Sequence, residues 1–584
     1  MSESNSAAWS TAENAWGAHE PEPRSFEFGP WSWELRGDEI ADVRFDGTVV
    51  LRMVRVVARD RDWNTVPTEV TAIRSGEASV EIDLSMVGLG ANITATLTIE
   101  VDAGIRFYVS GTSHTAFERN RLGFVVLHPP SVAGAPLGVI SPDGSRIDTA
   151  FPTQVSPHQP AFDIAALEWA ADSIASTLRF EGEVFEMEDQ RNWTDASFKT
   201  YGTPLALPFP VALPAGHEFS QTLELLSSRV APAPSERRGP IMLVAAGPVP
   251  EISVGASTAP GSGPSVVVPV STVLIELETE QPVWRDALAR TARSRVPLDV
   301  RIVTSEADDI DPVLDALGGV LVRRLGVFSA DTHVTEPNLW ARLEESVAAR
   351  GLDVELVAGT RAHFTELNRS RERLIPSADS VTFSVTPQMH ARERAQLVES
   401  IEMQAVVARD AASIAGGRPV HVGPITLRAR FNAVSTTPRT AGPATLDGGY
   451  GAHLDDNATD ERQTSVAARA WTVASFAALA AAGVASACYF EEWGPRGLMD
   501  SDGTPYPVLD AIQKLHALHG QTALVPRQSS HNLFVFGAIS DDTVTVLAAN
   551  LSAEERSVAF ESEFASGRIT VGPFDVATVA IPRG

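Results

Sequence analysis

Apolar and polar residues alternate with a period of two along most of the first ~230 residues, the pattern of strands that bury one face. Asp-Gly turn signals, as at 46–47 and 143–144, separate the segments. The segments with this pattern are 41–45, 49–58, 78–86, 93–101, 105–109, 122–127 and 222–226. Because they lack helical periodicity, we expect a large antiparallel β-sandwich.

The pattern changes after a Pro-rich, charged stretch at 231–239, which is typical of a linker. Strands are then predicted at 273–277, 298–303, 320–327, 354–358, 381–385, 420–425 and 485–490, and helices at 284–293, 339–350, 395–412, 466–482 and 508–518. This strand-then-helix repetition predicts a parallel (β/α)8 barrel of the TIM type. The eighth strand is predicted either at 241–245 or near Met499. An open doubly wound sheet is the alternative, although the sequence has no Gly-rich dinucleotide loop.

The last ~60 residues alternate again. Their predicted strands are 533–536, 543–548, 557–560, 568–571 and 576–581. We therefore expect a multidomain α/β plus β protein with three parts: an N-terminal β-sandwich at 1–235, a catalytic barrel at 236–525 and a small C-terminal β-sandwich at 526–584. A β–barrel–β layout is common in carbohydrate-active hydrolases, which is an analogy of fold alone.

Charge and composition narrow the partners. The chain has 584 residues and a formal net charge of −28, which disfavours nucleic acid and anionic membrane surfaces. It has no apolar run long enough to span a membrane, and its N-terminus lacks the features of a signal peptide, so a cytoplasmic protein is expected. Cys488 is the single cysteine, and no His motif has metal-ligand spacing, so we expect neither metal nor cofactor. A homo-oligomer is compatible with the sequence.

Active sites of parallel barrels lie at the carboxyl ends of the strands. There the loop GTRAHFTELNR (359–369) places Glu366 beside Asn368 and Arg369. A carboxyl next to an amide and several cations suits proton transfer on a polar substrate. The alternative is a solvated loop with an ion pair.

A second carboxyl pair ends the last predicted barrel strand, where Glu491 and Glu492 are adjacent. Their side chains point to opposite faces, so one enters the barrel mouth and the other forms a structural ion pair. Gln388 and His390, after 381–385, could orient substrate hydroxyls or belong to a plain turn. Arg428, Arg430 and Asn432 could grip a carboxylate or form an exposed loop.

The sandwich also carries dense polar chemistry. The candidate substrate-binding residues there are His128, Asp189, Arg191, Asn192, Trp193 and Lys199. Lys199 is conspicuous because all but two of the 46 basic residues are Arg. Mixed donors and acceptors with a stacking Trp suit a sugar cleft. A network that docks the sandwich onto the barrel is at least as plausible.

Six phrases together resemble one family. They are LGFVVLHPP (122–130), FEMEDQRNWTDASFKTYGTPL (185–205), GTRAHFTELNR (359–369), FSVTPQMHA (383–391), PITLRARFN (424–432) and YFEEWGPRGL (489–498). The chain resembles the D-apionate lactonases of bacterial apiose catabolism. The resemblance implies hydrolysis of D-apionolactone to the aldonate, and a barrel similar to that of the retaining glycoside hydrolases.

Those hydrolases use an acid/base after their fourth strand and a nucleophilic Glu near their seventh. The resemblance implies Glu366 for the first position and Glu491 for the second, although the order Glu-Leu-Asn and the extra Glu492 depart from the pattern. We hypothesise that one of Glu366 and Glu491 is the base and the other the acid, with Arg430 or His390 stabilising the oxyanion and no metal. A retaining glycosidase acting on an apiosyl or other glycoside, with the same two glutamates, is the main alternative. A non-catalytic carbohydrate-binding protein is the second.

Overall fold

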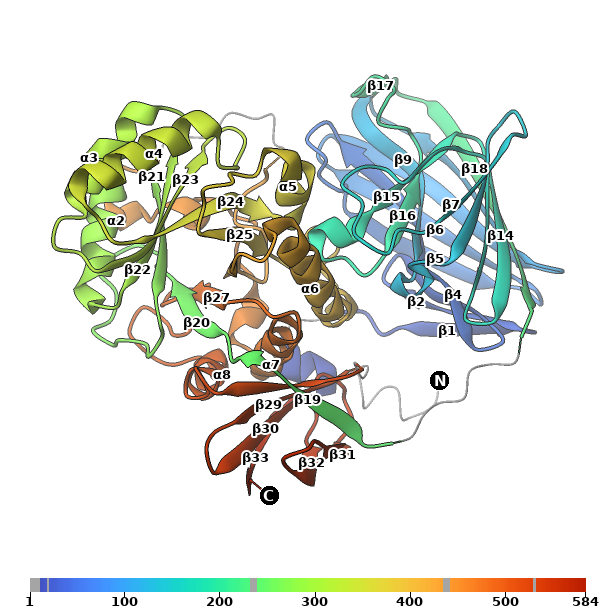
Figure 1. Cartoon of the computed structure of the whole chain (residues 1–584). Coiled ribbons are helices and arrows are strands. Elements are labelled where there is room, and N and C mark those ends of the chain that lie inside the picture. The colour runs from blue at the N-terminus through green and yellow to red at the C-terminus, as the bar shows by residue number, and fades with distance from the viewer. Residues whose placement is uncertain (1–10, 18–19, 232–238, 434–441, 529–531, 584) are drawn as a thin grey trace.

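The computed structural model describes residues 11–17, 20–231, 239–433, 442–528 and 532–583. The predicted linker at 231–239 therefore lies almost entirely outside the described residues. Figure 1 shows a large β-sandwich beside an α/β barrel, with a smaller sheet below the barrel.

Two nine-stranded sheets form the sandwich. The first runs in the order β1 (Arg24–Phe28), β2 (Trp31–Arg36), β3 (Glu39–Phe45), β4 (Thr48–Asp60), β9 (Phe117–His128), β16 (Phe198–Tyr201), β15 (Phe185–Asp189) and β12 (Ala161–Ile164), with β17 (Val211–Leu213) on β9. The second runs β11 (Arg146–Ala150), β10 (Pro136–Ile140), β13 (Ala166–Ala171), β14 (Ile174–Glu181), β18 (His217–Arg229), β8 (Ile105–Ser113), β7 (Ala91–Val101), β6 (Ser79–Gly88) and β5 (Thr68–Ser75). All seven segments predicted in this region coincide with strands. The alternation is the cause, since Ile93, Ala95, Leu97 and Ile99 of β7 are buried while the residues that alternate with them are more accessible.

The barrel is closed, with eight strands in sequence order. They are β20 (Glu251–Gly255), β21 (Val273–Glu278), β22 (Leu298–Thr304), β23 (Val322–Ser329), β24 (Glu355–His363), β25 (Ser380–Val385), β26 (Val420–Ile425) and β27 (Ser486–Glu491). Its helices are α2 (Trp284–Thr291), α3 (Ile310–Ala316), α4 (Pro337–Arg350), α5 (Phe364–Arg369), α6 (Arg394–Ala415), α7 (Val466–Ala481) and α8 (Pro507–His516). The seven predicted strands and five predicted helices are confirmed, and the open-sheet alternative is wrong because β20 pairs with β27.

Both positions predicted for the eighth strand are wrong. The missing strand is β20, the first of the barrel. Residues 241–245 belong to β19 (Ile241–Pro248), in which Leu243 is the one buried residue. By contrast, four of the five residues of β20 are buried, as a barrel strand requires. Met499 pairs with Pro505 in an isolated bridge.

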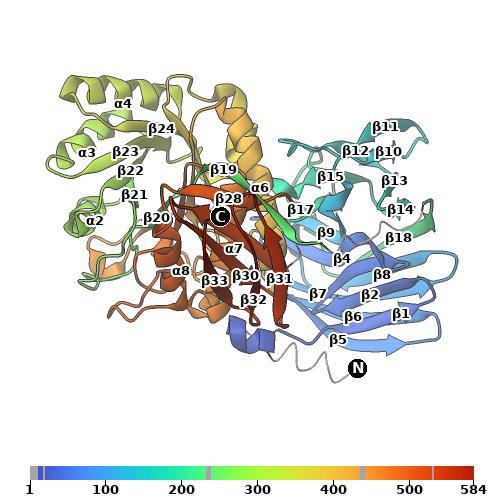
Figure 2. The ribbon, with the colours of Figure 1, turned by 60° about the horizontal axis from the view of Figure 1, so that its bottom comes forward.

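β19 joins the C-terminal strands in a seven-stranded sheet. Its order is β32 (Ser566–Val571), β31 (Arg556–Glu561), β19, β28 (Thr522–Pro526), β29 (Leu533–Ile539), β30 (Thr543–Asn550) and β33 (Val576–Pro582). The five strands predicted here are confirmed, and Figure 2 shows this sheet with α7 behind it. Phe536 packs edge-on against Phe476 of α7, with ring centroids 5.5 Å apart. This sheet contains β19, which precedes the barrel strands in the sequence, together with strands that follow them. The domain boundaries at 235 and 525 therefore stay a prediction.

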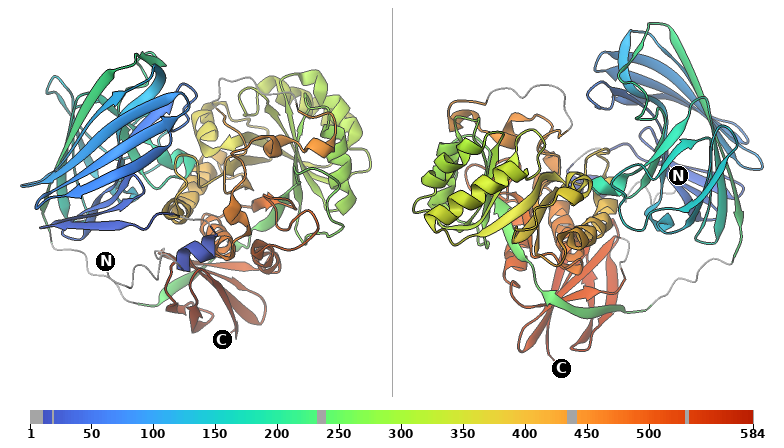
Figure 3. Two further views of the ribbon diagram at one scale, coloured as in Figure 1. Left: turned by 180° about the vertical axis from the view of Figure 1, so that it is seen from behind. Right: turned by 45° about the horizontal axis from the view of Figure 1, so that its top comes forward.

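Direct contacts connect the sandwich to the barrel. Arg52 of β4 donates to Glu399 of α6 at 2.6 Å, and Thr365 of α5 donates to the carbonyl of Asn192 at 3.0 Å. At the N-terminus, residues 11–16 form a helix whose Trp16 is buried in the barrel core, and Figure 3 shows this helix beside the C-terminal sheet. Among the described helices, none has the length and apolar character needed to cross a bilayer.

Candidate active site

A cavity of about 870 Å³ opens at the carboxyl ends of the barrel strands. We call it the mouth cavity. Its charged lining residues are Glu276, Glu278, Glu280, Asp331, Arg361, Arg430, Asp455 and Glu491. Trp284, Phe431 and Leu454 add apolar surface. Its position and mixed lining are those of a small-molecule site in a parallel barrel.

Glu276 and Glu278 lie two residues apart on β21 and therefore on the same face of the strand. Arg361 donates from Nη2 to both carboxylates at 2.8 Å, and Arg430 donates to Glu276 at 2.6 Å. Burial acts to raise the pKa of Glu276, but Arg361 and Arg430 hold it well below its ordinary value. Glu276 is therefore an ionised group that fixes two guanidinium groups in the cavity wall.

The network of Glu276, Glu278, Arg361 and Arg430 contains polar atoms that could still form hydrogen bonds. Within the described residues, Nε and Nη1 of Arg361 and Oε1 of Glu276 are buried without a hydrogen-bond partner. Buried polar atoms are costly to leave unpaired, so such atoms in the wall of a cavity indicate a polar ligand. Sequence reasoning missed Glu276 and Glu278, although two glutamates in alternation at the end of a buried strand were the available signal.

Glu491 ends β27 and is 7% exposed. Its Oε1 accepts from Arg496 Nε at 2.8 Å and from Thr258 Oγ1 at 2.7 Å, and its Oε2 accepts from the Thr258 amide at 2.9 Å. These donors hold the carboxylate against the mouth cavity. Glu492 is not among the residues that line this cavity, and burial raises its pKa to about 7 despite the charge of Arg290. Of the adjacent pair, Glu491 is therefore the one that enters the mouth.

Glu366 lies elsewhere. It occupies the third position of α5, whose N-cap is His363, and it does not line the mouth cavity. Burial raises its pKa to about 7, opposed by Arg369 and by a backbone hydrogen bond at His363. Within the described residues, Glu366 Oε2 is buried without a hydrogen-bond partner. Glu366 is thus a carboxyl of raised pKa at the start of α5, separate from the residues that line the mouth cavity.

Arg430 lines the mouth, but other predicted site residues lie at the contact between sandwich and barrel. Lys199 pairs with Glu188 at 2.6 Å, and His390 Nδ1 lies 2.5 Å from Asp195. Trp193 contacts His390 edge-on at 5.2 Å, and the Arg369 guanidinium lies 5.4 Å from the Trp193 ring. The structure thus brings Lys199, Trp193, Arg369 and His390 together, outside the residues that line the mouth.

The remaining predicted residues lie in buried networks. Asp189 pairs with Arg191 at 2.7 Å, and Arg191 also donates to the carbonyl of Pro152 at 2.8 Å. Asn368 donates to Asn192 at 3.0 Å, across the contact between sandwich and barrel.

Gln388 donates to Asp460 at 2.8 Å. His128 contacts Thr200 at 2.9 Å inside the sandwich, where burial lowers its pKa to about 3. The groups of these networks bind one another, so their contacts stabilise the docking of loops and domains.

The barrel strands that precede Glu366 and Glu491 have other numbers than the resemblance to the glycoside hydrolases implies. Because β20 is the first strand, β24 before Glu366 is the fifth and β27 with Glu491 is the eighth. The fourth strand, β23, is followed by Glu336, whose carboxylate accepts from Thr332 at 2.8 Å and does not line the mouth. The strand positions implied by the resemblance are therefore wrong by one for both glutamates.

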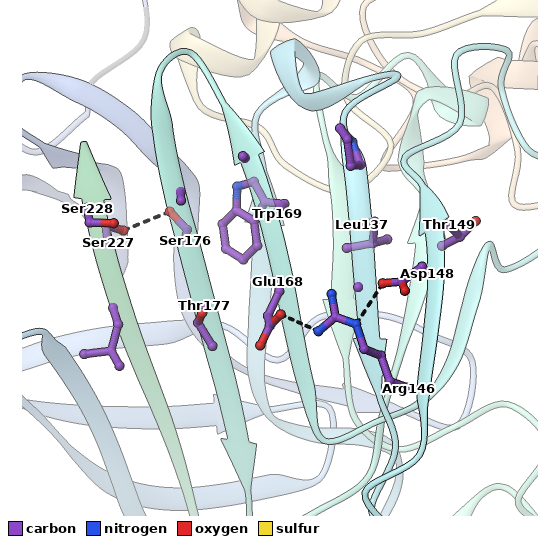
Figure 4. A pocket seen from close by; sticks show the side chains of 15 residues that line it. Leu137, Arg146, Asp148, Thr149, Glu168, Trp169, Ser176, Thr177, Ser227 and Ser228 are labelled. Carbon is purple, nitrogen blue, oxygen red and sulfur yellow. Dashed lines mark hydrogen bonds and ion pairs between the residues drawn. The ribbon is translucent and has the colours of Figure 1, made fainter. Parts of the chain in front are cut away.

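A second hollow, of about 550 Å³, lies on the second sandwich sheet (Figure 4). There Arg146 pairs with Asp148 and Glu168, and Ser176 contacts Ser227 at 2.9 Å. The charged groups and the two serines of this hollow are thus paired with one another. The mouth cavity is therefore the stronger candidate for catalysis.

A closed parallel barrel with a polar cavity at its carboxyl end is the architecture of an enzyme. The sequence profile of the D-apionate lactonase N-terminal domain matches residues 11–229, and that of the D-apionate lactonase TIM barrel domain matches residues 266–520. The chain belongs to the D-apionate lactonase family and is a hydrolase.

A D-apionate lactonase of Brucella anthropi is 26% identical over 561 residues, which cover 86% of this chain and 88% of that protein. The solved structures are less similar to this chain in sequence. SrfJ from Salmonella typhimurium is 8% identical, with a TM-score of 0.41 over 62% of this chain and 96% of its own. A GH30 endoxylanase from Clostridium papyrosolvens is 10% identical, with a TM-score of 0.36 over 59% of this chain and 97% of its own. Similarity at this level supports no conclusion about function.

Proposed function

We propose that this enzyme opens a sugar lactone in the mouth cavity, with D-apionolactone as substrate and D-apionate as product. One observation carries the choice of site: Arg361 and Glu276 present buried atoms without partners, within the described residues, at the wall of a cavity large enough for a sugar. A lactone offers a carbonyl oxygen to the donors and ring hydroxyls to the acceptor. The family of the chain agrees with this chemistry.

The proposed reaction needs no metal. Glu491 takes a proton from water as the water oxygen attacks the lactone carbonyl carbon. Negative charge develops on the carbonyl oxygen, where Arg361 and Arg430 stabilise it. The bond from this carbon to the ring oxygen then breaks, and the leaving oxygen takes the proton from Glu491. The product acid ionises to the aldonate and releases one proton to solvent.

In this scheme Glu491 serves as both base and acid. Glu366 takes no part in this scheme, because it is not among the residues that line the mouth cavity. Arg496 and Thr258 keep the Glu491 carboxyl oriented between turnovers.

A substrate panel tests the proposal. Purified enzyme is given D-apionolactone, other aldonolactones and nitrophenyl glycosides, with proton release and nitrophenol absorbance as readouts. We expect proton release with lactones and no nitrophenol. Cleavage of a nitrophenyl glycoside without lactone opening would replace the lactonase by the retaining glycosidase.

A further inference from the structure

We propose that the first sandwich sheet carries a second binding site, separate from the mouth, for the carboxylate of a sugar acid. Its cationic groups are Arg59 on β4, Arg121 on β9 and Lys199 on β16. We call this surface the sandwich-face site. It is independent of the proposed lactonase reaction.

Strand register brings these residues together. Arg59 is paired with Arg121 across β4 and β9, Lys199 is opposite Glu188 across β16 and β15, and Tyr201 is opposite Glu186. The residues that alternate with them, such as Ala58, Leu122 and Phe198, belong to the sandwich core. The site residues therefore share the face that points away from this core.

On that face, Met53, Val57, Val125 and Tyr201 form a small apolar cluster of their own. This gives the polar groups a dry floor.

Positive charge exceeds negative charge at this face. Glu188 is bound to Lys199, and Glu186 accepts from the Tyr201 hydroxyl at 2.7 Å. Arg121 is 4% exposed; its Nη2 lies 4.0 Å from Glu186 and has no hydrogen-bond partner in the described parts of the chain. Arg59 donates to the carbonyl of Trp63 at 3.2 Å and forms no ion pair with a described residue. Arg59 thus lacks an ion pair within the described residues, and Arg121 has only the 4.0 Å pair with Glu186, in a protein of net charge −28.

The electrostatics of the site agree with a missing anion. Burial lowers the pKa of Lys199; Glu188 opposes this effect, and the charges of Arg59 and Arg121 reinforce it. Burial and the neighbouring Arg55 and Arg121 also lower the pKa of Arg59, against the charges of Glu188 and Asp195. Crowded, partly desolvated cations raise the free energy of the empty site, and a bound carboxylate would lower it.

Aromatic groups favour a sugar acid over a small inorganic anion. The Arg121 guanidinium lies 4.9 Å from the Trp63 ring and 4.7 Å from the Tyr201 ring. Trp63 also contacts Phe209, which is 49% exposed. Such a wall can stack on the apolar face of a sugar, while Glu188 accepts from hydroxyls and the guanidinium groups bind the carboxylate in a bidentate manner.

Calorimetric titration with D-ribonate, and with neutral ribitol and inorganic phosphate as comparison ligands, tests this site. The variant is Arg59→Met, which removes a cation without leaving Glu188 unpaired. Its control is Arg61→Met, which removes an exposed arginine two residues away that pairs with Glu118. We expect Arg59→Met to lose a ribonate-binding event, or to weaken it at least tenfold, while Arg61→Met keeps it. Lactone turnover should stay unchanged in both.

Equal ribonate binding by the two variants would overturn the proposal, and so would phosphate or ribitol binding as tight as that of ribonate. If Arg59→Met fails to fold, the neutral double variant Lys199→Met/Glu188→Gln replaces it, with the same expected loss. Retention of ribonate binding by that folded double variant would also refute the site.

Discussion

The mouth cavity and the sandwich-face site contain the same kinds of charged residue, but carboxylates are in excess in the mouth and cations on the sandwich face. The mouth is lined by Glu276, Glu278, Glu280, Asp331, Asp455 and Glu491 against Arg361 and Arg430. On the sandwich face, Arg59, Arg121 and Lys199 outnumber Glu186 and Glu188. An acidic mouth accepts a neutral lactone and repels the anionic product, whereas a cationic face attracts an anion. The excess of one sign of charge, more than the kinds of residue, therefore distinguishes a site that releases an anionic product from a site that binds an anion.

The largest effect should come from Glu491→Gln. Loss of a general base costs about 10²–10⁴-fold in rate, so we expect kcat to fall by about a thousandfold. Glu492→Gln is the matched control, because Glu492 is adjacent and half-buried but does not line the mouth. It should retain kcat within a few-fold. Steady-state kinetics with D-apionolactone measures both variants, and similar losses in the two would remove the special role of the mouth.

Arg430→Met should cause the next largest loss. Arg430 donates to Glu276 in the mouth, and removal of an oxyanion donor costs about 10²–10³-fold. We expect kcat/KM to fall by about a hundredfold. Arg428→Met is the control, because Arg428 pairs with Asp460 at 3.0 Å and lines a different cavity of about 600 Å³. A greater loss for Arg428→Met would contradict the placement of the reaction.

Glu366→Gln should change turnover by no more than a few-fold, because Glu366 does not line the mouth cavity. Its effect should be on stability. The pKa of Glu366 is raised from 4.5 to about 7 in the folded state, so wild-type stability falls as the pH rises from about 4.5 through 7. Gln does not ionise, so the variant lacks this loss. Its free energy of unfolding relative to that of the wild type should therefore be about 2 kcal/mol higher at pH 8 than at pH 4. Urea unfolding at both pH values measures this gain. A stability difference between variant and wild type that is the same at both pH values, together with lost turnover, would indicate instead that Glu366 is catalytic.

The sequence predicted most of the fold because each element has a strong local pattern. The alternation in β7 and the apolar strands from β21 to β27 are clear without tertiary information. β20 was missed because five residues between Pro250 and the loop after Gly255 are too short to show a period.

The candidate site was less predictable. Glu491 was predictable because it ends a strand, and Arg430 because it lies in the loop that follows one. Glu276 and Glu278 were missed because they lie within an apolar strand and not in a polar loop. The burial of Asn368 at a domain contact depends on partners distant in sequence.

The most direct test is a crystal structure of the Glu491→Gln variant with D-apionolactone bound. We predict the lactone ring in the mouth cavity, with its carbonyl oxygen about 3 Å from a guanidinium nitrogen of Arg361 or Arg430 and its carbonyl carbon facing residue 491. A lactone bound instead beside Glu366, His390 and Lys199, with the mouth empty, would contradict the account.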